Sequence, residues 1–287
     1  MLPTFCVRTK GTVVPIRPVC RMSAWLLVVT GGLTGIAFGD DAKAPTKPLV
    51  QAHAHNDYLH QRPLLDAVDR GFMSVEADIF LVQGELLVAH DVLGLRRERT
   101  LAKLYLDPLR ELIRRRQGWM YEAGQSLTLL IDIKSEAQPT YAALHELLAQ
   151  YADIMTTVKE GVVETKAVTA IISGNRPRDT ITAQKVRYAG IDGRVADLDS
   201  DVPVDLVPLI SDSWLSHFRW KGEGPMPAAD RQKLAEIVRR AHARHRRVRF
   251  WAIPDQRAVW QELRAAGVDL INTDDLDGLQ EFLTKEP

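Results

Sequence analysis

The sequence predicts one TIM-type (β/α)8 barrel, on the basis of three observations. Short apolar runs alternate with helical patterns along the chain, which is typical of a parallel sheet covered on both faces. About eight such units fit into residues 49–287, which is the usual size of a closed barrel. No linker after Pro48 is long enough to divide this part into two domains. An open, doubly wound sheet is the alternative architecture.

The strands are predicted from apolar runs bounded by turns or helical patterns. Proline donates no hydrogen bond to a sheet, so Pro203 and Pro208 weaken the prediction for the run that they border. The expected strands are residues 49–53, 73–81, 85–89, 127–133, 167–172, 187–191, 204–210, 248–253 and 268–272.

The helices are predicted from apolar residues three and four positions apart. Gly71 ends the first helix, and Pro108 begins the second, where its missing N–H costs nothing. The expected helices are residues 63–69, 108–116, 141–149, 228–244, 256–266 and 275–283.

Charge is distributed unevenly between the start of the chain and the rest. The chain holds 37 basic and 37 acidic residues, so it is formally neutral and shows no basic surplus that would indicate nucleic-acid binding. Residues 1–39 contain four basic residues and no acidic one, which leaves 33 basic and 37 acidic residues for the remainder. The two parts are therefore expected to have different roles.

Residues 1–39 have the pattern of a signal peptide. Basic residues come first, an apolar run from Ala24 to Phe38 follows, and small residues stand just before Asp40. The run is shorter than the roughly 20 residues of a membrane span. We therefore expect an exported protein, periplasmic or secreted, with residues 40–48 as a linker and 49–287 as the barrel. An uncleaved N-terminal anchor is the alternative.

Residues with chemical potential cluster at the predicted strand ends. Active sites of barrels lie at the carboxyl ends of the strands, where the loops converge. The relevant segments are His53 to Tyr58, Glu76 to Asp78, His90-Asp91, Asp132 to Lys134, Trp251 and Asn272 to Asp274.

Three carboxylates predict a metal site. Glu76 and Asp78 are two positions apart on one strand, so their side chains point the same way, and Asp132 lies within another apolar run. Buried together they would repel one another, and one divalent cation would remove that cost. Ligands that are all oxygen favour Mg²⁺ or Ca²⁺. The alternative is a rim position with arginine partners.

Three histidines stand at the ends of predicted strands next to these acids: His53, His55 and His90. Histidine titrates near neutral pH, so two rings can serve as base and acid in one reaction. The pattern at His60, His145, His242 and His245 instead predicts solvated surface residues. A solvated helix end is likewise the preferred interpretation of the basic run 244–249, with a lipid-surface contact as the alternative.

These motifs, in this order, resemble the glycerophosphodiester phosphodiesterase and phosphatidylinositol-phospholipase-C-like superfamily. The resemblance runs through nearly all of residues 49–283. It implies a TIM barrel with Glu76, Asp78 and Asp132 as metal ligands, and with a first-strand histidine and His90 as the catalytic pair. The segment 130–134 is similar to the third acidic ligand followed by a lysine, and 249–251 is similar to the strand whose tryptophan lines the site.

The chain departs from the glycerophosphodiesterase pattern at the first strand. It has His53-Ala54-His55-Asn56 in place of His-Arg-Gly, and it lacks the small insertion domain. His53 and Asn56 resemble the His-x-x-Asn of the sphingomyelinase D branch, which favours His53 over His55 as catalytic. The other ring would then bind substrate or orient a ligand.

The predicted function is metal-dependent cleavage of a phosphodiester, of glycerophosphodiester or phospholipid head-group type. We expect one divalent cation, catalytic roles for His53, His90 and Lys134, and substrate contacts from His55, Asn56, Trp251 and Arg176. The product would be a monoester after attack by water, or a cyclic phosphate after attack by a substrate hydroxyl. The sequence indicates no obligate protein partner and leaves a peripheral membrane contact open. The alternatives are a silent barrel that binds a phosphorylated ligand and a metal-dependent sugar isomerase.

Overall fold

The computed structural model describes residues 47–121 and 123–285. The predicted signal segment 1–39 and most of the linker lie outside these residues, so export stays a prediction. Within the described part, no helix is both long enough and apolar enough to cross a bilayer. The first strand begins at Leu49, where the sequence predicted the barrel to start.

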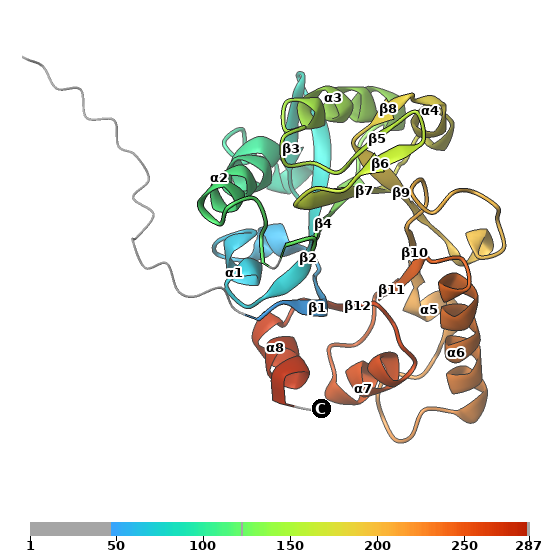
Figure 1. The fold of residues 1–287 in the computed structure, drawn as a ribbon. Helices are drawn as coiled ribbons and strands as arrows, with labels where there is room; N and C mark the ends of the chain where they lie inside the picture. The colour runs from blue at the N-terminus through green and yellow to red at the C-terminus, as the bar shows by residue number, and fades with distance from the viewer. Residues whose placement is uncertain (1–46, 122, 286–287) are drawn as a thin grey trace, which may run out of the picture. The chain divides into compact units, whose positions relative to one another are not determined.

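Eight parallel strands form a closed barrel, as predicted. The order around the barrel is β1-β12-β11-β10-β9-β7-β4-β2, and β2 closes the ring by pairing with β1. Figure 1 shows the strands in this ring, with the helices outside it. The barrel strands are β1 (Leu49–Ala54), β2 (Phe72–Val82), β4 (Leu127–Ile133), β7 (Val168–Gly174), β9 (Ala189–Gly193), β10 (Leu209–Ser213), β11 (Arg247–Trp251) and β12 (Leu270–Thr273).

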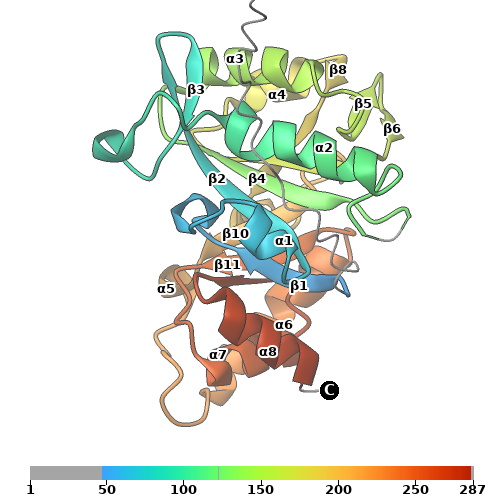
Figure 2. The same cartoon turned by 90° about the vertical axis from the view of Figure 1, so that its left-hand side faces the viewer.

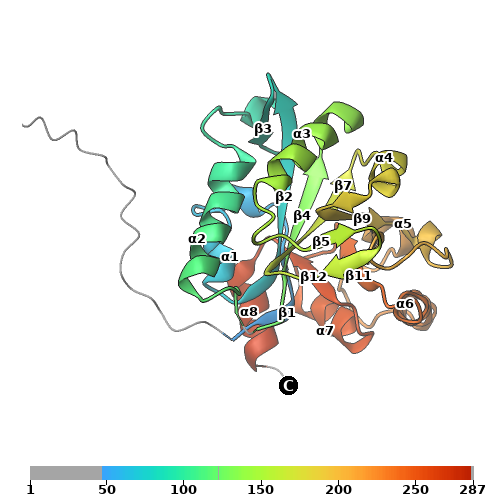
Figure 3. The same ribbon diagram turned by 45° about the horizontal axis from the view of Figure 1, so that its top comes forward.

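The helices pack on the outer face of the barrel. In α6, the buried residues Leu234, Ile237, Val238 and Ala241 recur at helical spacing and form the inward face. Figure 3 shows α2 and α3 beside β2 and β4. The helices are α1 (Leu65–Val68), α2 (Asp107–Arg115), α3 (Ala137–Ala149), α4 (Arg178–Ala183), α5 (Trp214–His217), α6 (Ala228–His242), α7 (Arg257–Ala265) and α8 (Leu276–Lys285).

Four short strands lie outside the barrel ring. β3 (Glu85–Val88) pairs antiparallel with the extended end of β2 and brings His90 back towards the barrel mouth. β5 (Thr157–Lys159), β6 (Val162–Glu164) and β8 (Val186–Arg187) form a separate small sheet. The sequence analysis did not predict β5, β6 or α4, because these elements are too short to show a clear period.

Two of the predicted strands have different bounds in the structure. The predicted strand 204–210 is mostly a turn, in which Pro203 O accepts from the N–H groups of Leu206 and Val207, and β10 begins only at Leu209. The predicted strand 187–191 is divided between β8 and β9, which belong to different sheets. In the segment 204–210, prolines prevent strand pairing before Leu209. In the segment 187–191, the chain passes from the small sheet of β8 to the barrel sheet of β9.

The barrel interior carries its own small apolar layer. Leu130, Ile171, Leu209 and Leu270 form a buried cluster separate from the main core between strands and helices. Residue alternation explains it, because Leu129 and Ile131 face the helices while Leu130 faces inward. This apolar layer lies directly beneath the polar residues at the carboxyl ends of the strands.

Candidate active site

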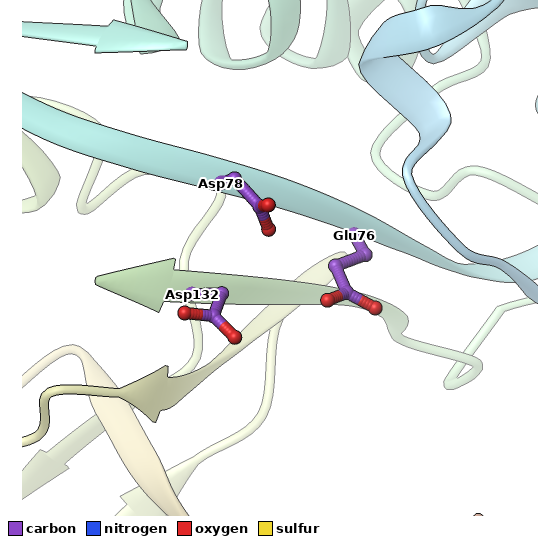
Figure 4. Close-up of side chains that lie close together, drawn as sticks. All are labelled: Glu76, Asp78 and Asp132. Carbon is purple, nitrogen blue, oxygen red and sulfur yellow. The ribbon is translucent and has the colours of Figure 1, made fainter. Parts of the chain in front are cut away.

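The three predicted carboxylates meet at the carboxyl end of the barrel. Strand pairing places Asp78 of β2 opposite Asp132 of β4, and Glu76 lies two residues earlier on the same face of β2. Figure 4 shows their carboxyl groups directed towards one another. One oxygen atom from each of the three residues lies within 4.8 Å of the others. This spacing fits a single cation held by three carboxylates.

Burial makes it unfavourable for all three carboxyl groups of this acidic cluster to be charged at once. Burial raises the pKa of the Asp132 carboxyl to about 6, against the opposing charge of Lys134. Burial and the charge of Glu76 also raise the pKa of Asp78. Asp78 Oδ1 is buried and has no hydrogen-bond partner among the described residues. A buried carboxylate oxygen without a donor is a position that a cation would satisfy.

Gly174 makes room for Asp132. It is the last residue of β7, it has φ of +66°, and a Cβ atom built on it would lie 2.1 Å from Asp132 Oδ1 and 2.5 Å from Ile133 O. Only glycine avoids both the left-handed strain and this overlap. The position of the third carboxylate therefore depends on the neighbouring strand.

Lys134 lies between two of the acids. Its Nζ atom is 3.1 Å from Asp78 Oδ2 and 3.4 Å from Asp132 Oδ1, and it lines the cavity described below. Burial alone would lower the pKa of Lys134, but the charges of Asp132 and Asp78 raise it. The ammonium group therefore stays charged beside the two carboxylates.

Tyr58 links the first strand to His90. Its hydroxyl donates to Asp78 Oδ2 at 2.7 Å and lies 3.2 Å from His90 Nδ1 and 2.7 Å from Asn56 Oδ1. His90 Nδ1 is 3.3 Å from Asp78 Oδ2, and its side chain is largely exposed at the mouth. The sequence analysis included Tyr58 in the segment at the end of the first strand but predicted no role for it.

His53 is completely buried below the mouth. Its Nδ1 atom is 2.7 Å from Ser74 Oγ, and its Nε2 atom is 3.1 Å from Glu76 Oε2. Burial and the nearby charge of Arg249 lower the pKa of His53 to about 3, so the ring is neutral. A neutral ring satisfies both contacts when Nε2 donates to Glu76 and Nδ1 accepts from Ser74.

His55 lies at the cavity surface. Its Nδ1 atom is 2.8 Å from Asp274 Oδ1, at the end of β12. Burial would lower the pKa of His55, but the bond with Asp274 raises it overall. The first strand thus supplies one sealed ring and one ring open to the cavity. Asn56 follows His55 with φ of +47° and also lines the cavity.

Arg249 is a buried partner of Glu76. Its Nη2 atom is 2.5 Å from Glu76 Oε2, and its Nε donates to Asn272 Oδ1 at 2.9 Å. Burial would raise the pKa of Glu76, but the charge of Arg249 and the bond with His53 lower it. The inward position follows from alternation along β11, because Val248 and Phe250 belong to the core beneath the helices while Arg249 lies on the opposite face, which it shares with Trp251.

The interpretation of residues 244–249 as a solvated helix end is therefore wrong for three of its four arginines. Arg249 lies inside the barrel, and Arg246 is buried with three backbone carbonyls as acceptors. Arg247 begins β11, is half-buried and donates through Nη1 to Thr128 Oγ1 of β4 at 3.0 Å. The prediction holds for Arg244, which is exposed and paired with Asp201. His145, also predicted as solvated, is half-buried beside Tyr141 and Tyr188.

A cavity of about 450 Å³ opens above the acidic cluster. Trp251 contributes a side of it and remains 39% exposed. Arg176, predicted to bind substrate, does not line this cavity, because its Nη1 turns back to Gly174 O at 3.1 Å. The neighbouring Asn175 and the unpredicted Arg194 line it instead. The lining residues are His55, Asn56, Glu76, His90, Asp132, Ile133, Lys134, Ser173, Gly174, Asn175, Arg194, Arg249 and Trp251.

The sequence matches a known family over more than half of its length. The model of the AIM6-like phosphodiesterase domain matches residues 41–191. The chain belongs to the AIM6-like phosphodiesterase family. A second model, of the glycerophosphoryl diester phosphodiesterase family, matches residues 247–277. The superfamily resemblance inferred from the motifs is confirmed.

Curated relatives carry the family name across several fungi. "Altered inheritance of mitochondria protein 6" of Eremothecium gossypii is 30% identical over 272 residues, which cover 82% of this chain and 69% of the relative. Its homolog in Arthroderma benhamiae is 26% identical over 263 residues, with 81% and 83% covered.

Solved structures with low sequence identity share the fold of this AIM6-like chain. A glycerophosphodiester phosphodiesterase from Parabacteroides distasonis superposes with a TM-score of 0.51 at 15% identity, covering 83% of this chain and 98% of that one. A calcium-dependent phosphoinositol-specific phospholipase C from Pseudomonas sp. gives 0.52 at 12% identity, covering 82% and 93%.

Proposed function

We propose that this chain is a metal-dependent phosphodiesterase acting on a glycerophosphodiester or a phospholipid head group. The observation that carries the proposal is that two of the three clustered carboxylates, one lysine and two accessible imidazoles line one cavity. Family membership supports a phosphodiester as the substrate class.

Glu76, Asp78 and Asp132 would hold one divalent cation, Mg²⁺ or Ca²⁺. The donors are all carboxylate oxygens, and Asp78 Oδ1 lacks any other partner among the described residues. The related fold of a calcium-dependent phospholipase C is consistent with this choice. The bound ion would stabilise the negative charge that builds up on the phosphoryl oxygens.

The protein's own residues would position the diester and move the protons. Lys134 Nζ faces the cavity and would donate to a non-bridging phosphoryl oxygen. One imidazole takes the proton of the attacking hydroxyl or water as the new P–O bond forms. The other gives a proton to the leaving alkoxide as the old P–O bond breaks. His90, open at the mouth, is one of these rings.

The second ring is His53 or His55, and their surroundings differ. The sequence pattern favours His53, which in this geometry is sealed behind Glu76. His55 is open to the cavity and is held by Asp274, an arrangement that suits an acid or base. The residue that is not the acid or base would have a positioning role, His53 on Glu76 or His55 on the substrate.

Hydrolysis of bis-(p-nitrophenyl) phosphate tests the proposal. We expect turnover that EDTA abolishes and that Mg²⁺ or Ca²⁺ restores, and a loss of kcat of about 10²-fold or more in His90→Ala with folding retained. A folded, metal-loaded protein that binds phosphate but turns over no diester would refute the enzyme and support a silent binder. Action on free sugars alone would support the isomerase.

His53→Asn and His55→Asn separate the two rings. Replacing a ring that only orients Glu76 should lower the apparent metal affinity, and saturating metal should restore kcat. Replacing a ring that transfers a proton should lower kcat at any metal concentration and remove one limb of the pH–rate profile. Phosphorus NMR of the product distinguishes a monoester from a cyclic phosphate.

Export is part of the proposal and rests on residues 1–39 alone. N-terminal sequencing of the exported protein should find a start close to Asp40. Retention of Met1 or Met22 in the mature protein would contradict it.

A further inference from the structure

Large apolar side chains stand exposed on the loops that border the cavity mouth. Leu59 follows β1, Val92 and Leu93 follow β3, Leu215 lies in α5 directly after β10, and Trp251 ends β11. Leu93 is 84% exposed, Leu59 69% and Leu215 58%. We refer to these five residues as the apolar arc.

The strand order places the five residues of the arc around one side of the mouth. β10, β11, β12, β1 and β2 are consecutive neighbours in the barrel, and β3 extends from β2. Figure 2 shows α5, the turn after β1 and the turn after β3 on the same side of the molecule. The remaining strands β4, β7 and β9 lead into the polar residues Lys134, Asn175 and Arg194. The five exposed apolar side chains therefore stand on one side of the mouth, among the polar side chains of His55, His90 and Asp274.

The most exposed residue of the arc is held in place by its own turn. Asp91 Oδ1 accepts from the N–H groups of Leu93 at 2.9 Å and Gly94 at 3.0 Å. Arg96 Nη1 donates to Leu93 O at 3.0 Å. These bonds fix a protruding turn that presents Leu93 to solvent. Keeping leucine side chains in water forgoes the free energy that burial would give, so such a cluster indicates a binding surface.

We propose that the apolar arc inserts into a phospholipid surface and presents a lipid phosphodiester to the cavity. The inference rests on the proposed function, because a phosphodiester lipid has both a phosphate head group and acyl chains. Its charged head group suits the polar cavity, and its acyl chains suit the arc beside it. The five side chains stand on four separate segments, so each segment can enter a fluid surface on its own.

Charges near the arc do not select a strongly anionic surface. Exposed residues of both signs flank Leu93 and Leu215, and exposed acidic residues follow β11 and β12. Because both signs are present, burial of the apolar side chains has to drive binding. A zwitterionic surface should therefore suffice, and salt should weaken binding little. The basic residues are Arg96, Arg97, Arg219 and Lys221, and the acidic residues are Asp91, Glu98, Glu223, Asp255 and Asp274.

Sedimentation with phosphatidylcholine vesicles tests the proposal. A chain that begins at Asp40 is suitable, since it lacks the apolar leader but keeps every core residue from Leu49 to Phe282. We expect it to partition onto the vesicles, and the double variant Leu93→Ser/Leu215→Ser to partition at least about tenfold less strongly.

The matched control is Val162→Ser/Val163→Ser. These exposed valines belong to β6, which precedes β7 and therefore lies towards the amino-terminal end of the barrel. The control removes as many exposed apolar side chains and should bind vesicles like the unsubstituted chain. Equal loss in both double variants, or no loss in the arc variant, would overturn the proposal.

Hydrolysis of bis-(p-nitrophenyl) phosphate distinguishes failure of the surface from failure of the proposed function. The arc variant should cleave this soluble diester at the unsubstituted rate and lose turnover only on vesicle lipid. An unsubstituted chain that cleaves the soluble diester but ignores vesicles, even with added phosphatidylserine, refutes the surface and leaves the enzyme. Vesicle binding without any diester cleavage supports the surface and refutes the enzyme.

Discussion

At the residue scale, Gly174 and Asp57 occupy positions that tolerate little change in size or charge. Gly174 allows the chain of β7 to pass Asp132, and Asp57 holds the turn after β1. Asp57 Oδ2 accepts from the N–H of Leu64 and from the Tyr105 hydroxyl at 2.9 Å, while its Oδ1 is buried without a partner among the described residues. Both positions give measurable consequences.

Gly174→Ala should destabilise the fold and weaken metal binding together. The new Cβ would overlap Asp132 Oδ1 and Ile133 O, in addition to the cost of positive φ. We expect a loss of more than about 2 kcal/mol in urea unfolding, made of this strain and the displaced carboxylate. Gly224→Ala is the control, because its φ is +62° but nothing lies within 4 Å of the new Cβ. Equal losses in the two variants would contradict the role of Gly174.

Asp57 should make stability depend on pH between about 4 and 7. Burial raises the pKa of Asp57 to about 7 from its usual 3.8, so the folded state holds the proton more tightly than the unfolded state. The stability from this group is complete below pH 4 and is lost as the pH rises through 7. The slope reaches about 1.4 kcal/mol per pH unit.

Chemical unfolding of the unsubstituted protein and of Asp57→Asn, in EDTA across this pH range, isolates the contribution. The variant should have a shallower decline in unfolding free energy, while other buried acids act equally in both proteins. Parallel curves would show that Asp57 has no such role.

At the scale of elements, a buried arginine joins a loop to the start of β11. Arg246 donates through Nη1 to Asp197 O at 2.5 Å and through Nη2 to Ser200 O at 2.8 Å and Val202 O at 2.7 Å. These carbonyls belong to the segment between β9 and β10. One side chain therefore fixes the connection of adjacent barrel strands, although the sequence pattern indicated a solvated residue.

Arg246→Met should destabilise the protein by about 2 kcal/mol or more, because three carbonyl acceptors lose a charged donor. The neighbouring Arg244→Met removes only an exposed ion pair with Asp201 and should change the unfolding free energy by less than about 1 kcal/mol. Thermal and urea unfolding of both variants provide the comparison. A larger effect at position 244 would reverse this assignment.

At the scale of the whole molecule, the acidic cluster would couple folding to binding of the proposed cation. Glu76 and Asp78 come from β2 and Asp132 from β4, so the complete site exists only when these strands are paired. A cation that binds the folded state alone stabilises it by mass action.

Mg²⁺ or Ca²⁺ at about one hundred times its dissociation constant should raise the unfolding free energy by about 2.7 kcal/mol. Asp132→Asn should remove most of this increase, because it takes a full charge from the ligand set. Calorimetry in EDTA and in each metal measures both. Metal stabilisation that persists unchanged in Asp132→Asn would place the ion elsewhere.

The sequence alone determined the fold class and the strand ends that carry the chemistry. Both depend on local patterns: β4 was predicted with its observed bounds because five of its seven positions are apolar and form a nearly continuous run. The two proposed metal ligands on β2 were also predictable, since Glu76 and Asp78 share a strand face whatever the rest of the chain does.

The tertiary structure decided which of these groups meet. Closure of the barrel brings Arg249 to Glu76 across 173 positions of sequence, seals His53 and leaves His55 open beside Asp274. It also turns Arg176 away from the cavity and brings Arg194 to it. No local period encodes these contacts, because they depend on the order and register in which distant strands pair.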